Sequence, residues 1–217
     1  MRGEDIHRCL SLLHAAVSAW ERPAVTVVAE RGNPFQVLVS CILSLRTQDR
    51  TTADASRRLF ALADTPGKLA LLPVEEIERA IYPVGFYRNK AVQIRDICVR
   101  LVEEYGGRVP DDMELLLAFK GVGRKTANLV LTLGFGKQGI CVDVHVHRIC
   151  NRWGYVKTRT PEQTESALRA KLPPEYWIEI NDLLVTFGQN QCYPVSPRCS
   201  TCPLAELCDR VGVLKAR

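Results

Sequence analysis

Two residues that together could perform covalent chemistry lie in the middle of the chain, Lys125 and Asp143. A lysine amine attacks carbon only when it is neutral, so it needs either a lowered pKa or a base that takes its proton. A carboxylate can accept that proton and later stabilise positive charge on a substrate. Each residue also has a simpler interpretation, Lys125 as a phosphate contact and Asp143 as a helix N-cap.

The sequence before Lys125 predicts a tight turn between two helices. Residues 121–123, Gly-Val-Gly, separate an apolar run over 112–119 from another over 124–133. The glycines permit close backbone approach because they carry no Cβ. Backbone N–H groups at the start of the second helix would then point outward and could bind a phosphate, with Arg124 beside them.

The surroundings of this pair are basic. Between residues 119 and 159 Asp143 is the single acid. The same stretch contains eight basic residues, Lys120, Arg124, Lys125, Lys137, Arg148, Arg152, Lys157 and Arg159. The net charge of +5 over 217 residues is mild, and alone it is weak support for a nucleic-acid partner. The local clustering is therefore the better indication of a polyanion site.

Four of the nine cysteines form a second candidate site with the spacing C-x6-C-x2-C-x5-C. They are Cys192, Cys199, Cys202 and Cys208. Thiolates this close together indicate a metal ion or cluster, whereas structural zinc sites typically use two C-x2-4-C pairs and this segment has one. An odd total argues against disulfides alone. The other five lie among apolar residues and are expected to be buried free thiols, in a reducing compartment: Cys9, Cys41, Cys98, Cys141 and Cys150.

The motifs GVGRKTAN and VDVH, with the spacing of the four cysteines, resemble the helix-hairpin-helix DNA glycosylases, and specifically the endonuclease III family. The resemblance covers about residues 34–208. It implies an all-α fold of two lobes with a DNA groove between them. A six-helix barrel lobe with the hairpin would span 27–137, and residues 1–26 plus 138–217 would form a lobe with the aspartate and a [4Fe–4S] cluster.

The resemblance implies a bifunctional enzyme of base excision repair, a DNA N-glycosylase with DNA-(apurinic or apyrimidinic site) lyase activity that acts on oxidised pyrimidines. Lys125 would displace the base and form a Schiff base, Asp143 would be its catalytic partner, and the strand would be cut by β-elimination. The four clustered cysteines would bind the [4Fe–4S] cluster. The implied DNA-binding residues are Gly121, Val122, Gly123, Arg124, Arg46, Phe86 and His145.

The chain departs from the family pattern at several of these places. Phe119-Lys120 replaces the usual Leu-Pro before the hairpin, and the loop before Asp143 has glycines but no proline. Arg46 stands where the family usually carries a glutamine that wedges into the duplex, so its opposite-base preference is expected to differ. Phe86 stands where the family carries a second, apolar wedge. The alternative interpretation is that Phe86 is a core aromatic at a helix junction.

Apolar periodicity predicts helices along the whole chain. Thr47 or Asp49 is expected to cap the helix that follows Arg46, and Asp111 or Asp112 the helix over 112–119. Residues 139–150 alternate as a strand does, but no partner strand is evident, so we expect an extended loop that becomes a helix after Asp143. The predicted helices cover about 5–20, 35–45, 49–62, short segments after Pro66 and Pro73, 89–105, 112–119, 124–133, 144–150, a segment from Pro161, and 176–187 ended by Gly188.

The N-terminus has no secretory h-region, and no apolar run approaches ~20 residues, so neither secretion nor a membrane partner is expected. We also expect a cytoplasmic, nucleoid-associated monomer. Its expected partner is double-stranded DNA with a damaged base or an abasic site. Two other functions fit parts of the sequence. A DNA-binding module without chemistry would need neither Asp143 nor a neutral lysine. A monofunctional mismatch glycosylase is the other, but such relatives generally lack the hairpin lysine.

Overall fold

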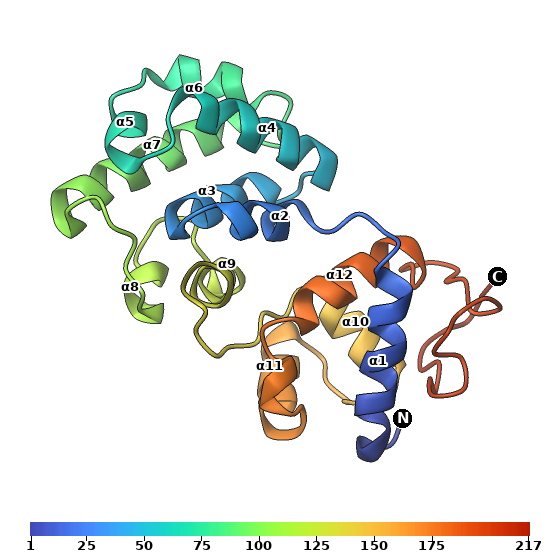
Figure 1. Cartoon of the computed structure of the whole chain (residues 1–217). Coiled ribbons are helices and arrows are strands. Elements are labelled where there is room, and N and C mark those ends of the chain that lie inside the picture. Colours follow the sequence, from blue (N-terminus) through green and yellow to red (C-terminus); the bar gives the residue numbers. More distant parts are fainter. The chain divides into compact units, whose positions relative to one another are not determined.

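The computed structural model describes residues 1–217, apart from the side chain of Arg31. It consists of helices and connecting turns, with no strand among the described residues, which confirms the predicted all-α class (Figure 1). The chain forms two compact units. One is Met1–Arg22 together with Gln138–Arg217, and the other is Pro23–Lys137.

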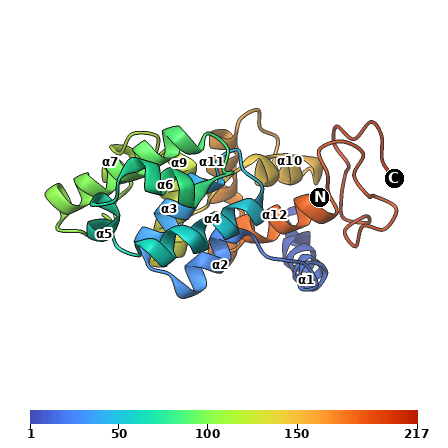
Figure 2. The ribbon, with the colours of Figure 1, turned by 90° about the horizontal axis from the view of Figure 1, so that it is seen from above.

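The unit Pro23–Lys137 is built around α3 (Pro34–Ser44), of which eight residues are buried. Helices α2, α4, α7 and α9 pack against or beside it, as two views of the ribbon show (Figures 1 and 2). Its other helices are α2 (Ala24–Arg31), α4 (Asp49–Leu62), α5 (Pro66–Ala70), α6 (Val74–Ile81), α7 (Tyr87–Tyr105), α8 (Met113–Leu117) and α9 (Arg124–Leu129), which continues as a π-helical turn, η2 (Val130–Gly134).

The other unit packs α1 (Ile6–Val17) and α10 (Val144–Arg152) against α12 (Ile180–Asn190). Trp153 and Phe187 are among the largest side chains of its core. The unit also contains α11 (Pro161–Lys171) and two short 3-10 turns, η1 (Gly3–Asp5) and η3 (Pro174–Tyr176). Residues 191–217 follow as turns and loops without a helix.

Helix starts largely follow the predicted capping chemistry. The Asp112 side chain accepts the backbone N–H groups of Glu114 and Leu115 at 2.9 and 3.0 Å, because these first N–H groups have no partner within the helix. The predicted cap of α4 by Thr47 or Asp49 is wrong. Gln48 occupies that position without a side-chain hydrogen bond, and Thr47 contacts another loop instead.

One observed helix has no counterpart among the predictions, and one predicted helix end is wrong. Helix α2 was not predicted, since Pro23 supplies no side-chain cap and the segment is rich in valine; burial of Ala24 and Val25 stabilises it. Helix α12 does not end at Gly188 but continues to Asn190. A Cβ on Gly188 would lie 2.3 Å from Nδ1 of His145, so this glycine provides space for α10.

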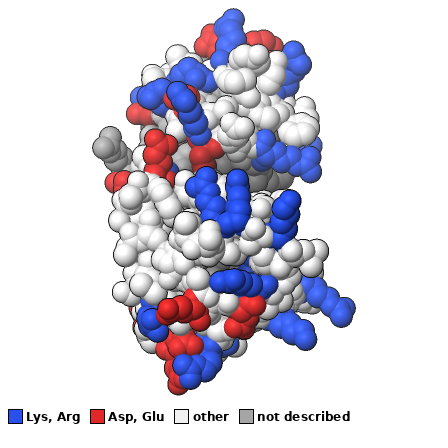
Figure 3. All heavy atoms as spheres, turned by 90° about the vertical axis from the view of Figure 1, so that its right-hand side faces the viewer, with Lys and Arg blue, Asp and Glu red and all other residues white. Residues whose placement is uncertain are grey.

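The surface carries mixed charge. Lys and Arg side chains and Asp and Glu side chains both lie on the face drawn in Figure 3, as the mild net charge suggests. None of the helices described is long and apolar enough to cross a membrane. The five scattered cysteines are buried free thiols, as predicted: Cys9, Cys41, Cys98, Cys141 and Cys150.

Because these thiols are buried, the free energy of unfolding should fall as the pH rises in the alkaline range. Burial raises the pKa of Cys98 from 9.0 to about 12, so the unfolded chain loses this proton at a lower pH than the folded chain does. The contribution of this thiol to the free energy of unfolding is complete below the unfolded pKa of 9.0 and should be lost at about 1.4 kcal/mol per pH unit above it. Urea unfolding of the wild type and Cys98→Ala at increasing pH tests this. The free energy of unfolding of the variant should fall less steeply, and parallel slopes would contradict the assignment.

Candidate functional site

The turn between α8 and α9 has the geometry that its glycines predict. Gly121 has a φ of +79°, a conformation that residues with a Cβ rarely adopt. Gln93 Nε2 donates to the carbonyl of Lys120 at 2.9 Å and supports the turn from α7. Val122 is buried beneath it. Gly123 is the N-cap of α9, and no described atom lies within 4 Å of the place where its Cβ would be, so backbone can approach a ligand here.

Lys125 is the second residue of α9 and is half-buried. Helix α9 packs against α3, where burial raises the pKa of Cys41 to about 12 and the charge of Lys125 acts in the opposite direction. The lysine therefore extends toward the interior of its unit.

Asp143 is the N-cap of α10 and is 8% exposed. Its Oδ1 accepts the backbone N–H groups of His145 at 2.8 Å and Val146 at 3.0 Å. The capping interpretation is therefore confirmed, but the cap engages one of the two carboxylate oxygens. Lys125 and Asp143 belong to different compact units, and each lies at the start of a helix.

The described contacts of the His145 side chain are with residues of its own compact unit. Its Nδ1 lies 3.1 Å from Nη2 of Arg148, which also donates to the carbonyl of Cys192 at 2.9 Å. Burial lowers the pKa of Arg148. The start of α10 is thus connected to the first of the clustered cysteines. The predicted contact of His145 with DNA stays a prediction.

Arg46 and Phe86 lie on two neighbouring loops of the unit Pro23–Lys137, with the guanidinium 5.6 Å from the ring centroid. The predicted alternative, that Phe86 is a core aromatic, is wrong, because its side chain is 61% exposed. Both residues have positive φ, +53° for Arg46 and +58° for Phe86, which is uncommon for residues other than glycine.

Sequence reasoning missed Lys90, a buried lysine beneath these two loops. It is 5% exposed, and burial lowers its pKa to about 8. The signal was present in the helix pattern. Lys90 falls in register with Ile94, Ile97 and Leu101 on the buried face of α7, where a charged side chain is rare unless it has specific partners.

The four clustered cysteines line one pocket together with Arg152 and Trp153. Arg152 of α10 holds the segment that begins at Cys192, because its guanidinium donates to the carbonyls of Tyr193 at 2.5 Å and Pro194 at 2.6 Å. It also donates to Sγ of Cys192 at 3.5 Å. The segment has no helix of its own, so its conformation depends on such contacts and on whatever the thiols bind.

The donor set fits an iron–sulfur cluster. Burial raises the pKa of Cys202 to about 11, and the nearby thiols of Cys208, Cys192 and Cys199 act in the same direction. Bound iron would offset this cost, because it stabilises the thiolate form. No three His, Cys, Asp or Glu side chains of the described residues are placed to bind a single metal ion. Four thiols around one pocket, with a single C-x2-C pair among them, suit a polynuclear group better than a structural zinc ion.

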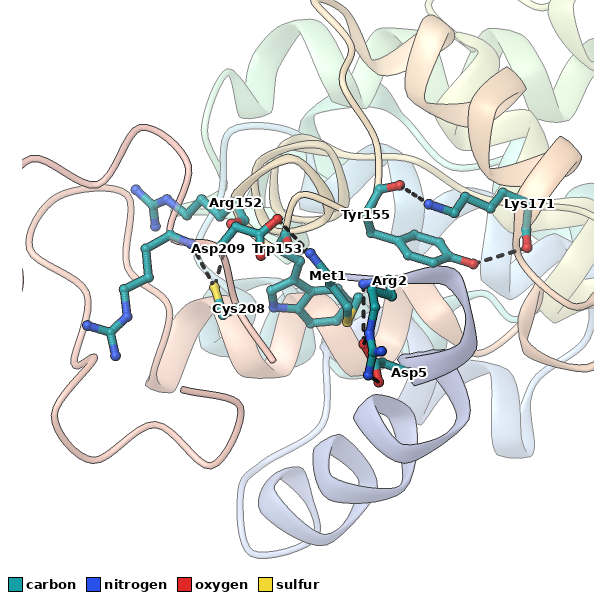
Figure 4. A network of polar contacts seen from close by, with 10 residues as sticks. Met1, Arg2, Asp5, Arg152, Trp153, Tyr155, Lys171, Cys208 and Asp209 are labelled. Carbon is teal, nitrogen blue, oxygen red and sulfur yellow. Dashed lines mark hydrogen bonds and ion pairs between the residues drawn. The ribbon is translucent and has the colours of Figure 1, made fainter. Parts of the chain in front are cut away.

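The residues after the last cysteine contact the N-terminus (Figure 4). The ammonium of Met1 donates to the carbonyl of Trp153 at 2.7 Å and to Oδ2 of Asp209 at 2.6 Å. Sγ of Cys208 accepts the backbone N–H of Arg210 at 3.4 Å. These contacts connect α1, α10 and the cysteine segment within one unit.

Comparisons with known proteins agree with both sites. Residues 39–174 match the family described as HhH-GPD superfamily base excision DNA repair protein, and residues 192–208 match the iron-sulfur binding domain of endonuclease III. Endonuclease III of Thermotoga maritima is 51% identical over 177 residues, which are 82% of this chain and 83% of that protein.

Two solved structures are similar over nearly the whole chain, each at 33% identity. A non-covalent endonuclease III–DNA complex has a TM-score of 0.83 and covers 97% of this chain and 96% of that one. A trapped endonuclease III–DNA covalent intermediate has a TM-score of 0.82 and covers 97% of both. The chain therefore belongs to the endonuclease III family of base excision repair enzymes, DNA glycosylases with AP lyase activity that carry a [4Fe–4S] cluster.

Proposed function

We propose that the protein removes oxidised pyrimidines from double-stranded DNA and cuts the strand at the abasic site, with Lys125 as the nucleophile and Asp143 as its proton acceptor. One observation carries the assignment of the pair: Lys125 is presented half-buried at the start of α9, directly after the open hairpin turn. A covalent intermediate with DNA has been trapped in a similar endonuclease III, and such an intermediate requires a nucleophile.

In the proposed reaction the neutral amine of Lys125 attacks C1′ of the damaged nucleotide, and the bond from C1′ to the base breaks. Asp143 accepts a proton from the amine. Opening of the sugar ring gives an imine between Lys125 and C1′. Loss of a proton from C2′ and departure of the 3′ phosphate then cut the strand by β-elimination.

The hairpin is the proposed seat for the DNA backbone. Backbone N–H groups at the start of α9 and the exposed Arg124 would bind phosphate, and Gly121 and Gly123 allow the close approach. We propose that the protein acts as a monomer on nucleoid DNA in the cytoplasm. We also propose that the units Pro23–Lys137 and Met1–Arg22 with Gln138–Arg217 are the barrel lobe and the cluster lobe.

The proposed ligands of the [4Fe–4S] cluster are the four thiols of the pocket, Cys192, Cys199, Cys202 and Cys208. When bound, the cluster holds this helix-free segment in one conformation. The contacts of Arg148 and Arg152 with the segment would then support α10, the helix that Asp143 caps.

The first of two predictions from the proposed function separates the two catalytic roles. On a duplex with one oxidised pyrimidine, Asp143→Asn should slow release of the base by about 10²- to 10⁴-fold. Helix content should be retained, because an amide oxygen can still accept both cap hydrogen bonds. Lys125→Gln should abolish strand cleavage while DNA affinity is largely retained, since glutamine has no nucleophilic amine. Free base and nicked strand are measured separately.

Lys68→Gln is the matched control, because Lys68 is exposed and pairs only with Asp64 across one turn. It should behave as the wild type. If Asp143→Asn releases base at the wild-type rate, Asp143 is only a cap. If the wild type binds DNA but releases no base, the protein is a binding module without chemistry.

The second prediction concerns the cofactor. The purified protein should be yellow-brown and contain about four iron and four sulfide ions per chain. Cys199→Ser should lose iron and the visible absorbance, because an incomplete set of thiolates cannot hold the cluster. Cys98→Ala, which removes a buried thiol of the other unit, should keep both. One zinc ion and no iron in the wild type would contradict the assignment.

A further inference from the structure

The amine of Lys90 binds the loop that carries Arg46. Its Nζ donates to the carbonyls of Leu43 at 2.9 Å and Leu45 at 2.5 Å and to Oγ1 of Thr47 at 3.3 Å. The two carbonyls lie at the C-terminal end of α3, where helix carbonyls lack partners within the helix and the helix dipole favours a cation. All three acceptors are neutral oxygens, so this buried lysine serves to order a loop rather than to form an ion pair.

The same loop is joined to the loop of Phe86. Oγ1 of Thr47 also accepts the backbone N–H of Gly85 at 3.1 Å. A Cβ on Gly85 would lie 2.5 Å from the carbonyl oxygen of Arg46, so only glycine allows the two backbones to come this close. Thr47 therefore connects Lys90 on one side to the Phe86 loop on the other.

The two residues carried at the ends of these loops are exposed and have strained backbones. Arg46 and Phe86, both with positive φ, present a guanidinium and an aromatic ring side by side. Such conformations cost free energy and persist where the surrounding structure enforces them. The contacts of Lys90, Thr47 and Gly85 supply that enforcement.

We propose that Lys90 is a positioning residue that holds the Arg46 and Phe86 loops together as one rigid element, which extrudes the damaged base and fills the space it leaves. The inference rests on the proposed function and deepens it, because it assigns how the same enzyme brings its substrate nucleotide out of the duplex. Extrusion costs the free energy of unpairing and unstacking a base. An element that is already rigid loses no further conformational entropy at that step.

The experiment compares two activities of the intact, cluster-containing protein. One duplex contains an oxidised pyrimidine, and a second contains a preformed abasic site, which has no base to unpair or unstack. Lys90→Met keeps the length of the side chain but removes every hydrogen bond of the amine. We expect base release to fall about 10- to 100-fold, as for misplaced groups remote from the chemistry. Cleavage at the abasic site should stay near the wild-type rate.

A second pair of variants and a second readout guard against a simple loss of folding. Thr47→Val removes the shared hydroxyl of a half-buried residue, and Thr47→Ser retains it as the matched control. Thr47→Val should reproduce the selective loss and Thr47→Ser should not. The fluorescence of 2-aminopurine placed beside the lesion should rise on binding of the wild type and rise less with Lys90→Met and Thr47→Val.

Normal base release by both Lys90→Met and Thr47→Val would overturn the inference, and so would an equal loss of both activities. If Lys90→Met does not fold, the same comparison of base release with abasic-site cleavage in Thr47→Val decides the inference. Failure of the wild type to cleave an abasic site would overturn the proposed function instead.

Discussion

The hydrogen bonds from the backbone N–H groups of His145 and Val146 to one oxygen of Asp143 fix the start of α10. The first N–H groups of a helix have no partners within it, so a buried start needs such a cap. The cap places this buried carboxylate at the start of α10, and we propose that the same group accepts a proton from Lys125. In this proposal, structural and chemical roles coincide in one side chain.

The rest of the chain can be understood as support for helix starts and the loops beside them. Lys125 lies at the start of α9, and the hairpin before it is held by Gln93. Helix α10 is fastened at the other side by the contacts of Arg148 and Arg152 with the cysteine segment. That segment lacks helices, so its order depends on these hydrogen bonds and on the cluster.

Much of this followed from local patterns in the sequence. The hairpin glycines, the cap at Asp112 and the spacing of the cysteines depend on neighbouring residues, and the structure and comparisons agree with them. The errors concern tertiary packing. Gly188 was expected to end a helix, but it makes space for His145, which lies far away in the sequence. Lys90 was overlooked because the oxygens that accept its hydrogen bonds lie some forty residues earlier.

The central claim is that Lys125 forms the covalent bond with DNA. Borohydride converts an imine into a stable amine, so treatment during turnover fixes the DNA to the residue that attacked it. Digestion of the adduct with protease and nuclease, followed by mass spectrometry, identifies that residue directly. The account predicts the sugar remnant on the peptide that contains Lys125. A remnant on any other amine of the chain, with Lys125 unmodified, would contradict it.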